Sequence, residues 1–269
     1  SYISRFSGRR AVLAYGDGAM AKDSLLASFA RDINLLRSAG LSPIVVHAGD
    51  RDLGQRENAT ETVPADRPSS GTIEMILTGR VNTELVSLLN HATAHAESAE
   101  SRAHGAQAAA IGLSGKDAGL FRGKRGTGAP TSINTDVLEM MLPKYVPVLS
   151  PVALGDDGES VLLDADQVAA DVAVALHADK LIYLADVAGL LEQGELVPEI
   201  TAADLRARLD AGTVPENVRG KLGAGLRALE AGVRSVHVID GRVPHSVIAE
   251  LFTDTGVGTL LKREGRNTT

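Results

Sequence analysis

The residues best suited to chemistry in this chain are a lysine and a pair of carboxylates. Lys221 begins an amphipathic helix, while Asp164 and Asp166 open another helix directly after a strand-like segment. A lysine near a helix N-terminus can reach a transferring phosphoryl group, and in an acidic protein it can equally be a solubilising surface residue. The carboxylates can cap their helix, or they can orient lysines and a metal around a nucleotide. The residues alone leave both interpretations open.

Three loops that contain glycine are further candidates for nucleotide contacts. Residues 16–18 (GDG) and 48–50 (AGD) each follow an apolar run, and glycine there lets backbone N–H groups approach a phosphate closely. An aspartate in each loop would repel a phosphate, and neither loop matches the P-loop or the G-x-G-x-x-G pattern. Asp186 and Gly189 follow a third run, where they can line a nucleotide pocket or simply form a turn.

Composition and charge narrow the class of protein. The chain has 269 residues, of which 44% are hydrophobic and only 3% aromatic, so we expect a core of Ala, Val, Leu and Ile. A formal net charge of −7 argues against nucleic-acid binding. The chain has no cysteine and no apolar run of membrane-spanning length, so we expect a cytoplasmic protein without membrane contact. His91, His95 and His104 have no partners that complete a ligand set, so no metal site is predicted.

The elements that must position these residues alternate between strands and helices. Apolar runs predict strands at 11–15, 42–47, 109–113, 147–149, 160–163, 180–184, 235–240 and 258–261. Helical spacing predicts helices at 23–39, 72–90, 135–142, 166–178, 201–211, 218–231 and 245–252, and residues 91–106 are interpreted as an inserted loop or loose helix.

Repeated βα units predict an α/β fold, a three-layer αβα sandwich with an open, mainly parallel sheet. Ligands of such sheets bind beyond the carboxyl ends of the strands, where the loops 16–20, 47–53, 164–168 and 185–189 lie. Pro151 and a glycine-rich turn predict two lobes, residues 1–150 and residues 151–269.

Several long segments resemble acetylglutamate kinases in collinear order. They include EMILTGRVNTELVSLLN at 74–90, GLSGKDAGLFRGK at 112–124, LLDADQVAADVAVAL at 162–176, ADKLIYLADVAGLL at 178–191 and VHVIDGRVPHSVIAELFTDTGVGTLL at 236–261. The resemblance implies the amino-acid kinase fold and phosphorylation of N-acetyl-L-glutamate by ATP with Mg²⁺. It also implies that residues 1–150 hold the amino-acid substrate and the dimer contacts, and that residues 151–269 hold the nucleotide and a candidate arginine site. Small-molecule amino acid and nucleotide are therefore the expected ligands.

The resemblance assigns roles to residues of the C-terminal lobe. Lys221 matches the family's second phosphate-contacting lysine, and Asp166 matches the aspartate that organises both catalytic lysines. Asp186 and Gly189 match the D-V-x-G of the nucleotide site. These correspondences make Lys221 and Asp166 the expected catalytic residues.

In the N-terminal lobe the chain departs from the family where chemistry is expected. Ala14 stands in place of the first catalytic lysine. Gly16 and Gly49 are kept as nucleotide-binding glycines, but other positions of the two phosphate loops are changed, at Asp17, Ala48 and Asp50. Such changes predict a weakened phosphoryl-transfer site.

Substrate-binding positions are also altered. An asparagine of the family is Leu162 here, and the substrate-binding arginine falls near Val63, with Arg67 as the nearest candidate to replace it. The G-G-M that precedes the second lysine is replaced by residues 216–218 (ENV).

A second set of matching residues belongs to the family's arginine effector site. His237, Glu250 and Gly256 match it by register, and Tyr2, Arg5 and Phe6 match an N-terminal helix that links dimers into a hexamer. The same residues can also be inherited core and surface positions. The resemblance thus implies a homodimer or a hexamer.

Together these features predict an inactive or nearly inactive paralogue that acts by binding nucleotide, arginine or an active kinase paralogue. One alternative is an ATP-dependent kinase for a different acidic substrate. Another is a functional acetylglutamate kinase in which residues such as Arg67 compensate for those lost.

Overall fold

The computed structural model describes residues 7–16, 22–49, 70–96, 109–253 and 256–263, with the side chains of 92–96 excepted. Its centre is an eight-stranded sheet in which every neighbouring pair is parallel except β13 and β14. In spatial order the strands are β12 (Glu199–Thr201), β14 (Thr259–Lys262), β13 (Ser235–Asp240), β9 (Lys180–Ala185), β1 (Arg10–Tyr15), β2 (Ser42–His47), β6 (Tyr145–Ser150) and β3 (Ala109–Ser114). The prediction of an open, mainly parallel sheet is confirmed.

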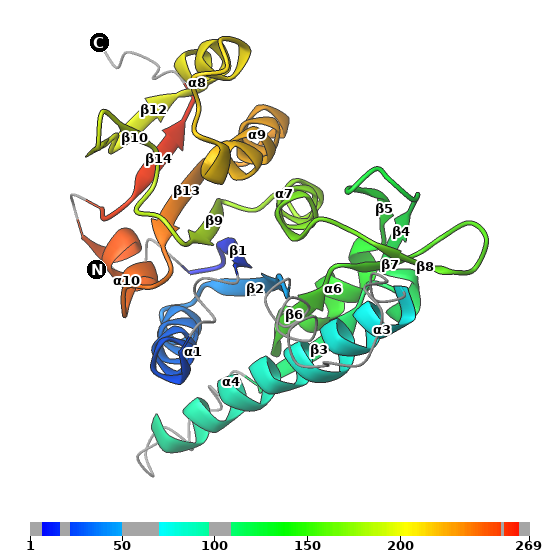
Figure 1. Cartoon of the computed structure of the whole chain (residues 1–269). Coiled ribbons are helices and arrows are strands. Elements are labelled where there is room, and N and C mark those ends of the chain that lie inside the picture. Colours follow the sequence, from blue (N-terminus) through cyan, green and yellow to red (C-terminus); the bar gives the residue numbers. More distant parts are fainter. Residues whose placement is uncertain (1–6, 17–21, 50–69, 97–108, 254–255, 264–269) are drawn as a thin grey trace, which may run out of the picture.

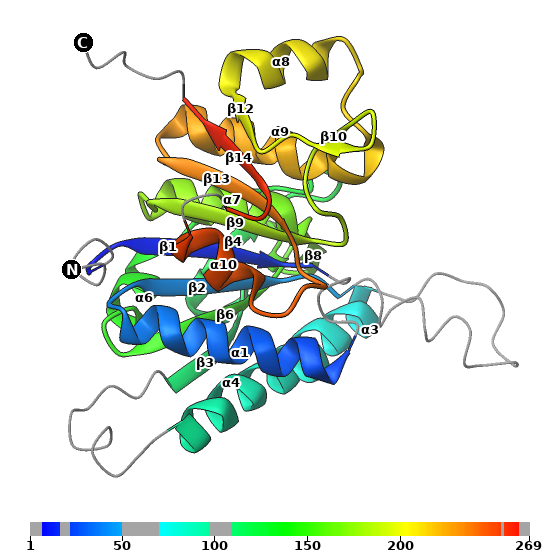
Figure 2. The same ribbon diagram turned by 90° about the vertical axis from the view of Figure 1, so that its left-hand side faces the viewer.

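Helices cover both faces of this sheet and form the outer layers of a three-layer sandwich (Figures 1 and 2). One layer holds α1 (Asp23–Ser38), α4 (Asn82–Ala96) and α10 (Ser246–Phe252). The other holds α6 (Thr135–Met141), α7 (Ala165–Ala175) and α9 (Glu216–Ala231), with α8 (Ala202–Asp210) packed on α9.

Strand β1 shows why the sheet needs both layers. Its residues alternate between the two sides of the sheet, because successive side chains of a strand point to opposite faces. Leu13 and Tyr15 pack into the core beneath α1 and α10, whereas Val12 and Ala14 pack into the core beneath α7 and α9. Ala14 therefore faces the helices that carry Asp166 and Lys221.

A second, four-stranded sheet lies beside the main one. Its order is β5 (Pro130–Ile133), β4 (Phe121–Gly123), β7 (Val152–Leu154) and β8 (Ser160–Leu162). Of these strands only β8 is predicted from the sequence, since the others are three or four residues long and carry no clear periodicity. A short hairpin of β10 (Leu191–Glu192) and β11 (Glu195–Leu196), and the 3₁₀ turn η3 (Asp117–Gly119), are also not predicted.

The segment predicted as one helix over 72–90 has an irregular start. It consists of α3 (Ser70–Glu74), a π-helical stretch η2 (Met75–Val81) and then α4, which continues to Ala96. The beginning of the supposed insertion at 91–106 is therefore regular helix. π-helical turns occur often at functional sites, and this one lies beside the cleft described below.

The boundary between lobes at residue 150 stays a prediction. In the main sheet, β1, β2, β3 and β6 lie within residues 1–150, and β9, β12, β13 and β14 lie within residues 151–269, whereas the small sheet joins strands from both sides of the boundary. Within the described ranges, no helix has the length and apolar character required to cross a membrane.

Candidate active site

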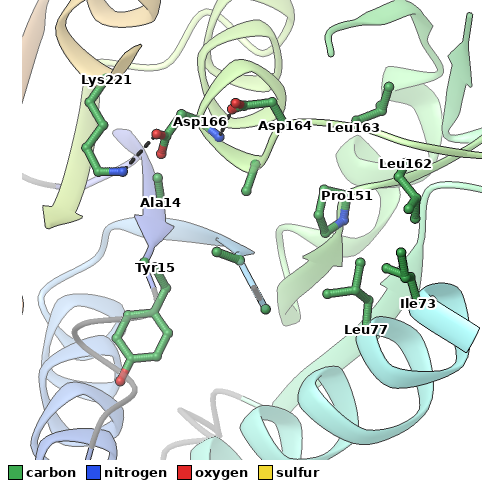
Figure 3. A pocket seen from close by; sticks show the side chains of 14 residues that line it. Ala14, Tyr15, Ile73, Leu77, Pro151, Leu162, Leu163, Asp164, Asp166 and Lys221 are labelled. Carbon is green, nitrogen blue, oxygen red and sulfur yellow. Dashed lines mark hydrogen bonds and ion pairs between the residues drawn. The ribbon is translucent and has the colours of Figure 1, made fainter. Parts of the chain in front are cut away.

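A cleft of about 340 Å³ lies beyond the carboxyl ends of β1 and β2, next to the first turn of α7 (Figure 3). Its described lining residues are Ala14, Tyr15, Gly16, Ala48, Gly49, Ile73, Leu77, Pro151, Leu162, Leu163, Asp164, Ala165, Asp166 and Lys221. Three of the four loops predicted to bind ligand contribute to this lining. The fourth, at 185–189, contributes none of the described residues.

An ion pair joins the two residues expected to be catalytic. The Lys221 ammonium lies 2.8 Å from Asp166 Oδ2, and the two side chains are 20% and 23% exposed. Asp166 is held in place because its carbonyl oxygen accepts a hydrogen bond from the buried Tyr183 hydroxyl at 3.1 Å. The arrangement leaves the ammonium at the wall of the cleft, where a ligand anion can reach it (Figure 3).

Asp164 has a different role from its neighbour. Its Oδ1 accepts hydrogen bonds from the backbone N–H groups of Asp166 at 2.8 Å and Gln167 at 3.0 Å, so it is the N-cap of α7. This confirms the capping interpretation for Asp164, whereas Asp166 pairs with the lysine. A role of Asp166 beside a nucleotide or a metal stays a prediction.

The position expected to hold a first lysine carries only a methyl group. Ala14 is 3% exposed and lines the cleft on the same side as Lys221 and Asp166 (Figure 3). Among the described lining residues the ionisable acids and bases are Asp164, Asp166, Lys221 and the phenol of Tyr15. In that part of the lining, two carboxylates therefore face a single ammonium, which is unfavourable for a bound polyphosphate.

Gly16 and Gly49 both lie where a Cβ would meet neighbouring atoms. A Cβ at residue 16 would lie 2.7 Å from the Leu184 carbonyl oxygen, and one at residue 49 would lie 2.3 Å from Leu77 Cδ2. The backbone contact explains Gly16 whether or not a phosphate binds here, whereas the contact at residue 49 is with the end of the flexible Leu77 side chain. Asp17, Asp50 and Arg67, which the sequence singles out, lie outside the described residues.

His47 supports the second loop in a way that the sequence does not predict. Its ring Nδ1 lies 2.7 Å from the Ala48 carbonyl oxygen, while Nε2 lies 3.2 Å from the Asn82 amide nitrogen and 3.0 Å from the Ser150 hydroxyl. The ring donates through Nδ1 and accepts through Nε2, which fixes the neutral form. Complete burial lowers the pKa of His47 to about 4, even though the bond to Ala48 acts to raise it.

Asp186 and Gly189 lie in the turn that follows β9, separate from the described lining of the cleft. Asp186 is exposed, as a residue that contacts a ligand can be. Gly189 has φ +146°, and a Cβ there would lie 2.5 Å from the Thr259 hydroxyl, which accepts a hydrogen bond from the Leu190 N–H. Turn geometry alone therefore requires this glycine.

The three residues matched to an effector site come together away from the cleft. Glu250 Oε1 lies 2.7 Å from His237 Nδ1, and Oε2 accepts the N–H groups of Val257 at 2.7 Å and Gly258 at 3.1 Å. Gly256, with φ +62°, passes so close that a Cβ would lie 3.0 Å from Glu250 Oε2.

The ionisation of this cluster follows from burial and hydrogen bonding. Burial lowers the pKa of His237. Burial acts to raise the pKa of Glu250, but the hydrogen bonds that Glu250 accepts from His237 and from the backbone outweigh burial, so the pKa of Glu250 is lowered. Lys180, which the sequence does not single out, adds an ammonium 3.4 Å from His237 Nε2, and burial lowers its pKa. Its position at the start of β9 is at the opposite end of the strands from the cleft.

Of the three histidines considered as metal ligands in the sequence, only His91 has a described side chain. His91 is an exposed residue of α4, the side chain of His95 is outside the described set, and His104 is outside the described residues. Across the described ranges, no cluster of three His, Asp or Glu side chains could hold a metal ion.

Comparison with known proteins decides the family. The model of the amino acid kinase family matches residues 9–240. The chain belongs to the amino acid kinase family. Within this family it is 37% identical to the acetylglutamate kinase of Stutzerimonas stutzeri (strain A1501), over 98% of this chain and 93% of the relative. It is also 37% identical to that of Marinobacter nauticus (strain ATCC 700491 / DSM 11845 / VT8), over 97% and 96% of the two chains.

Solved structures confirm the amino acid kinase fold. An N-acetylglutamate synthase from Neisseria gonorrhoeae, complexed with coenzyme A and L-arginine, matches with a TM-score of 0.79 at 24% identity. The match covers 98% of this chain but only 63% of the synthase chain. Carbamate kinase from Giardia lamblia bound to AMP-PNP matches with a TM-score of 0.67 at 14% identity, over 96% of this chain and 99% of the other.

Proposed function

We propose that this family member binds a nucleotide at the cleft but transfers phosphate to N-acetyl-L-glutamate only poorly, so that it acts mainly by binding. The observation that supports this proposal is the Lys221–Asp166 pair facing Ala14, one ammonium where the resemblance implies two. The curated relatives are acetylglutamate kinases, so the scaffold is one on which that chemistry is performed.

The residues of the cleft would contribute to nucleotide binding more than to phosphoryl transfer. Lys221 can neutralise charge on a nucleotide phosphate, and Asp166 holds the ammonium in position through the 2.8 Å contact. Ala14 adds no charge where phosphoryl transfer would develop it. Asp164 and Asp166 offer hard oxygen donors that suit Mg²⁺, an ion that usually enters such sites on the nucleotide phosphates with one or two carboxylates.

Two further assignments belong to the same proposal. Asp186 and Gly189 would contact the nucleotide from the turn after β9, as the D-V-x-G match implies. Arg67 would bind the carboxylate of an amino-acid substrate. The chain would act as a homodimer or hexamer, or together with an active kinase paralogue.

Titration of the chain with Mg-ATP tests nucleotide binding directly. We expect saturable binding by isothermal titration calorimetry, and we expect Lys221→Met to weaken it about 10- to 100-fold, because a charge-assisted contact is lost. The matched control is Lys144→Met, an exposed lysine outside the described lining of the cleft. Equal loss in both variants, or no binding by the unmodified chain, would contradict the proposal.

Arginine is the proposed ligand of the cluster formed by His237, Glu250 and Gly256. A working effector site should raise the melting temperature at millimolar L-arginine, since a ligand that binds only the folded state stabilises it. Glu250→Gln should abolish this shift, because it removes the carboxylate that a guanidinium would pair with. No shift with the unmodified chain would leave the cluster as an internal structural network.

A kinase for another acid is the second candidate function, and one observation favours it. The cleft wall opposite Lys221 is apolar where the resemblance implies polar substrate contacts, most clearly at Leu162.

A further inference from the structure

The cleft has two chemically different ends (Figure 3). Lys221, Asp166 and Asp164 form the charged end. The other end is formed by Ile73, Leu77, Pro151, Leu162 and Leu163, which we call the apolar compartment. Leu77, Pro151 and Leu163 are buried, whereas Ile73 and Leu162 are partly exposed and so available to a ligand.

The apolar compartment is held together by a cluster of polar side chains outside the described lining. The Lys116 ammonium lies 2.9 Å from Glu74 Oε1 and 3.0 Å from the Ser160 hydroxyl, which in turn donates to Glu74 Oε2. We call Glu74, Lys116 and Ser160 the clamp. Burial acts to raise the pKa of Glu74, but its bonds with Ser160 and Lys116 outweigh this effect and lower the pKa.

The clamp places the two partly exposed walls opposite one another. Ile73 immediately precedes Glu74 in α3, and Leu162 lies two residues beyond Ser160 in β8. Residues two apart in a strand share one face, so Ser160 and Leu162 both project to the same side of β8. Because the Glu74 carboxylate and the Lys116 ammonium neutralise each other there, neither charge is left to attract a polar ligand group.

From this geometry we infer that the apolar compartment takes the aliphatic side chain of a small carboxylic acid, with the acid group directed at Lys221. Burying aliphatic carbon against these residues is favourable, whereas burying a second carboxylate without a partner is costly. The inference refines the proposed function, because it rests on the cleft being the ligand site and names the class of acid.

A matched pair of ligands tests the inference without nucleotide. N-acetyl-L-leucine and N-acetyl-L-glutamate share the acetylated amino-acid backbone and differ in an isobutyl or carboxyethyl side chain. In calorimetric titrations of the full chain, we expect N-acetyl-L-leucine to bind at least about 10-fold more tightly, since hydrophobic pockets discriminate by factors of this order. Equal affinity, tighter binding of N-acetyl-L-glutamate, or binding of neither would overturn the inference.

Variants assign the preference to the apolar compartment. Leu162→Asn should reduce the ratio of the two affinities, because it places an amide on the wall that contacts the side chain. Ser160→Ala should weaken N-acetyl-L-leucine binding by loosening the clamp, whereas Ser132→Ala, at an exposed serine of β5 in the same small sheet, should not. An unchanged ratio in Leu162→Asn would place the preference elsewhere and overturn the inference.

The two proposals can fail separately. Loss of Mg-ATP binding with the preference for N-acetyl-L-leucine intact would contradict the nucleotide proposal alone. Mg-ATP binding with no preference between the acids would overturn the apolar compartment alone.

Discussion

The chain should phosphorylate N-acetyl-L-glutamate at least about 100-fold more slowly than the acetylglutamate kinase of Stutzerimonas stutzeri assayed beside it. Removing one group that stabilises transition-state charge typically costs 10²- to 10³-fold in rate. Ala14 represents one such loss, because its methyl group lines the cleft beside Lys221 and Asp166. The measurement is ADP release in a coupled assay at saturating ATP and acetylglutamate.

The rate should respond to charge at residue 14. Ala14→Lys should raise ADP release, because Ala14 faces the side of the sheet that carries Lys221, and a second ammonium there would oppose the charge of the transferred phosphoryl group. The matched control is Ala14→Met, which places a long side chain without charge at the same position of the cleft. A turnover rate of the unmodified chain equal to that of the Stutzerimonas stutzeri enzyme would contradict the prediction of slow phosphorylation.

Local patterns were sufficient to predict the helices of the outer layers and every strand of the main sheet except β12. Residues 180–184 and 235–240 read as strands because they are short runs rich in Val, Ile and Leu, and β9 and β13 occupy those positions. Of the small sheet, only β8 could be predicted in the same way. Its strands are three or four residues long, and β4 and β7 meet only through one paired position, Arg122 with Leu154.

The candidate site likewise contains residues that could be predicted from the sequence and residues that could not. Lys221 and Asp166 could be paired from the resemblance, and the structure brings them to 2.8 Å. The clamp has no comparable signal, because Glu74 is separated from Lys116 by 42 positions and from Ser160 by 86. Each of its residues reads as an ordinary surface polar group until the fold places all three together.

Asn82 illustrates how tertiary structure decides the role of a residue. In the sequence it is one polar position in an amphipathic helix, and its amide nitrogen in fact donates to the Val148 carbonyl oxygen at 2.9 Å. The same amide reaches His47, which lies 35 positions away at the end of β2. The loop that follows His47 lines the cleft at Ala48 and Gly49, so this buried contact holds that loop in position.

The buried His47 should make the fold sensitive to acid. Its pKa in the folded protein is about 4, against 6.5 for the ordinary histidine. A histidine whose pKa is lowered by folding contributes its full stability above the unfolded value, and that contribution is lost as the pH falls toward the folded value. Between pH 7 and pH 4 the free energy of unfolding should therefore fall by about 3 kcal/mol on account of this one residue.

Urea unfolding at pH 7 and pH 4 measures this loss in a pair of variants. His47→Asn should be less stable than the unmodified chain at pH 7, because the buried contacts with Asn82 and Ser150 are disturbed, and the difference should shrink at pH 4. His177→Asn, at an exposed histidine, should keep the pH dependence of the unmodified chain. The contribution of His237, whose pKa is also lowered by burial, is present in all three proteins and cancels in the comparison. An equal loss of stability in all three between pH 7 and pH 4 would show that His47 does not carry the acid sensitivity.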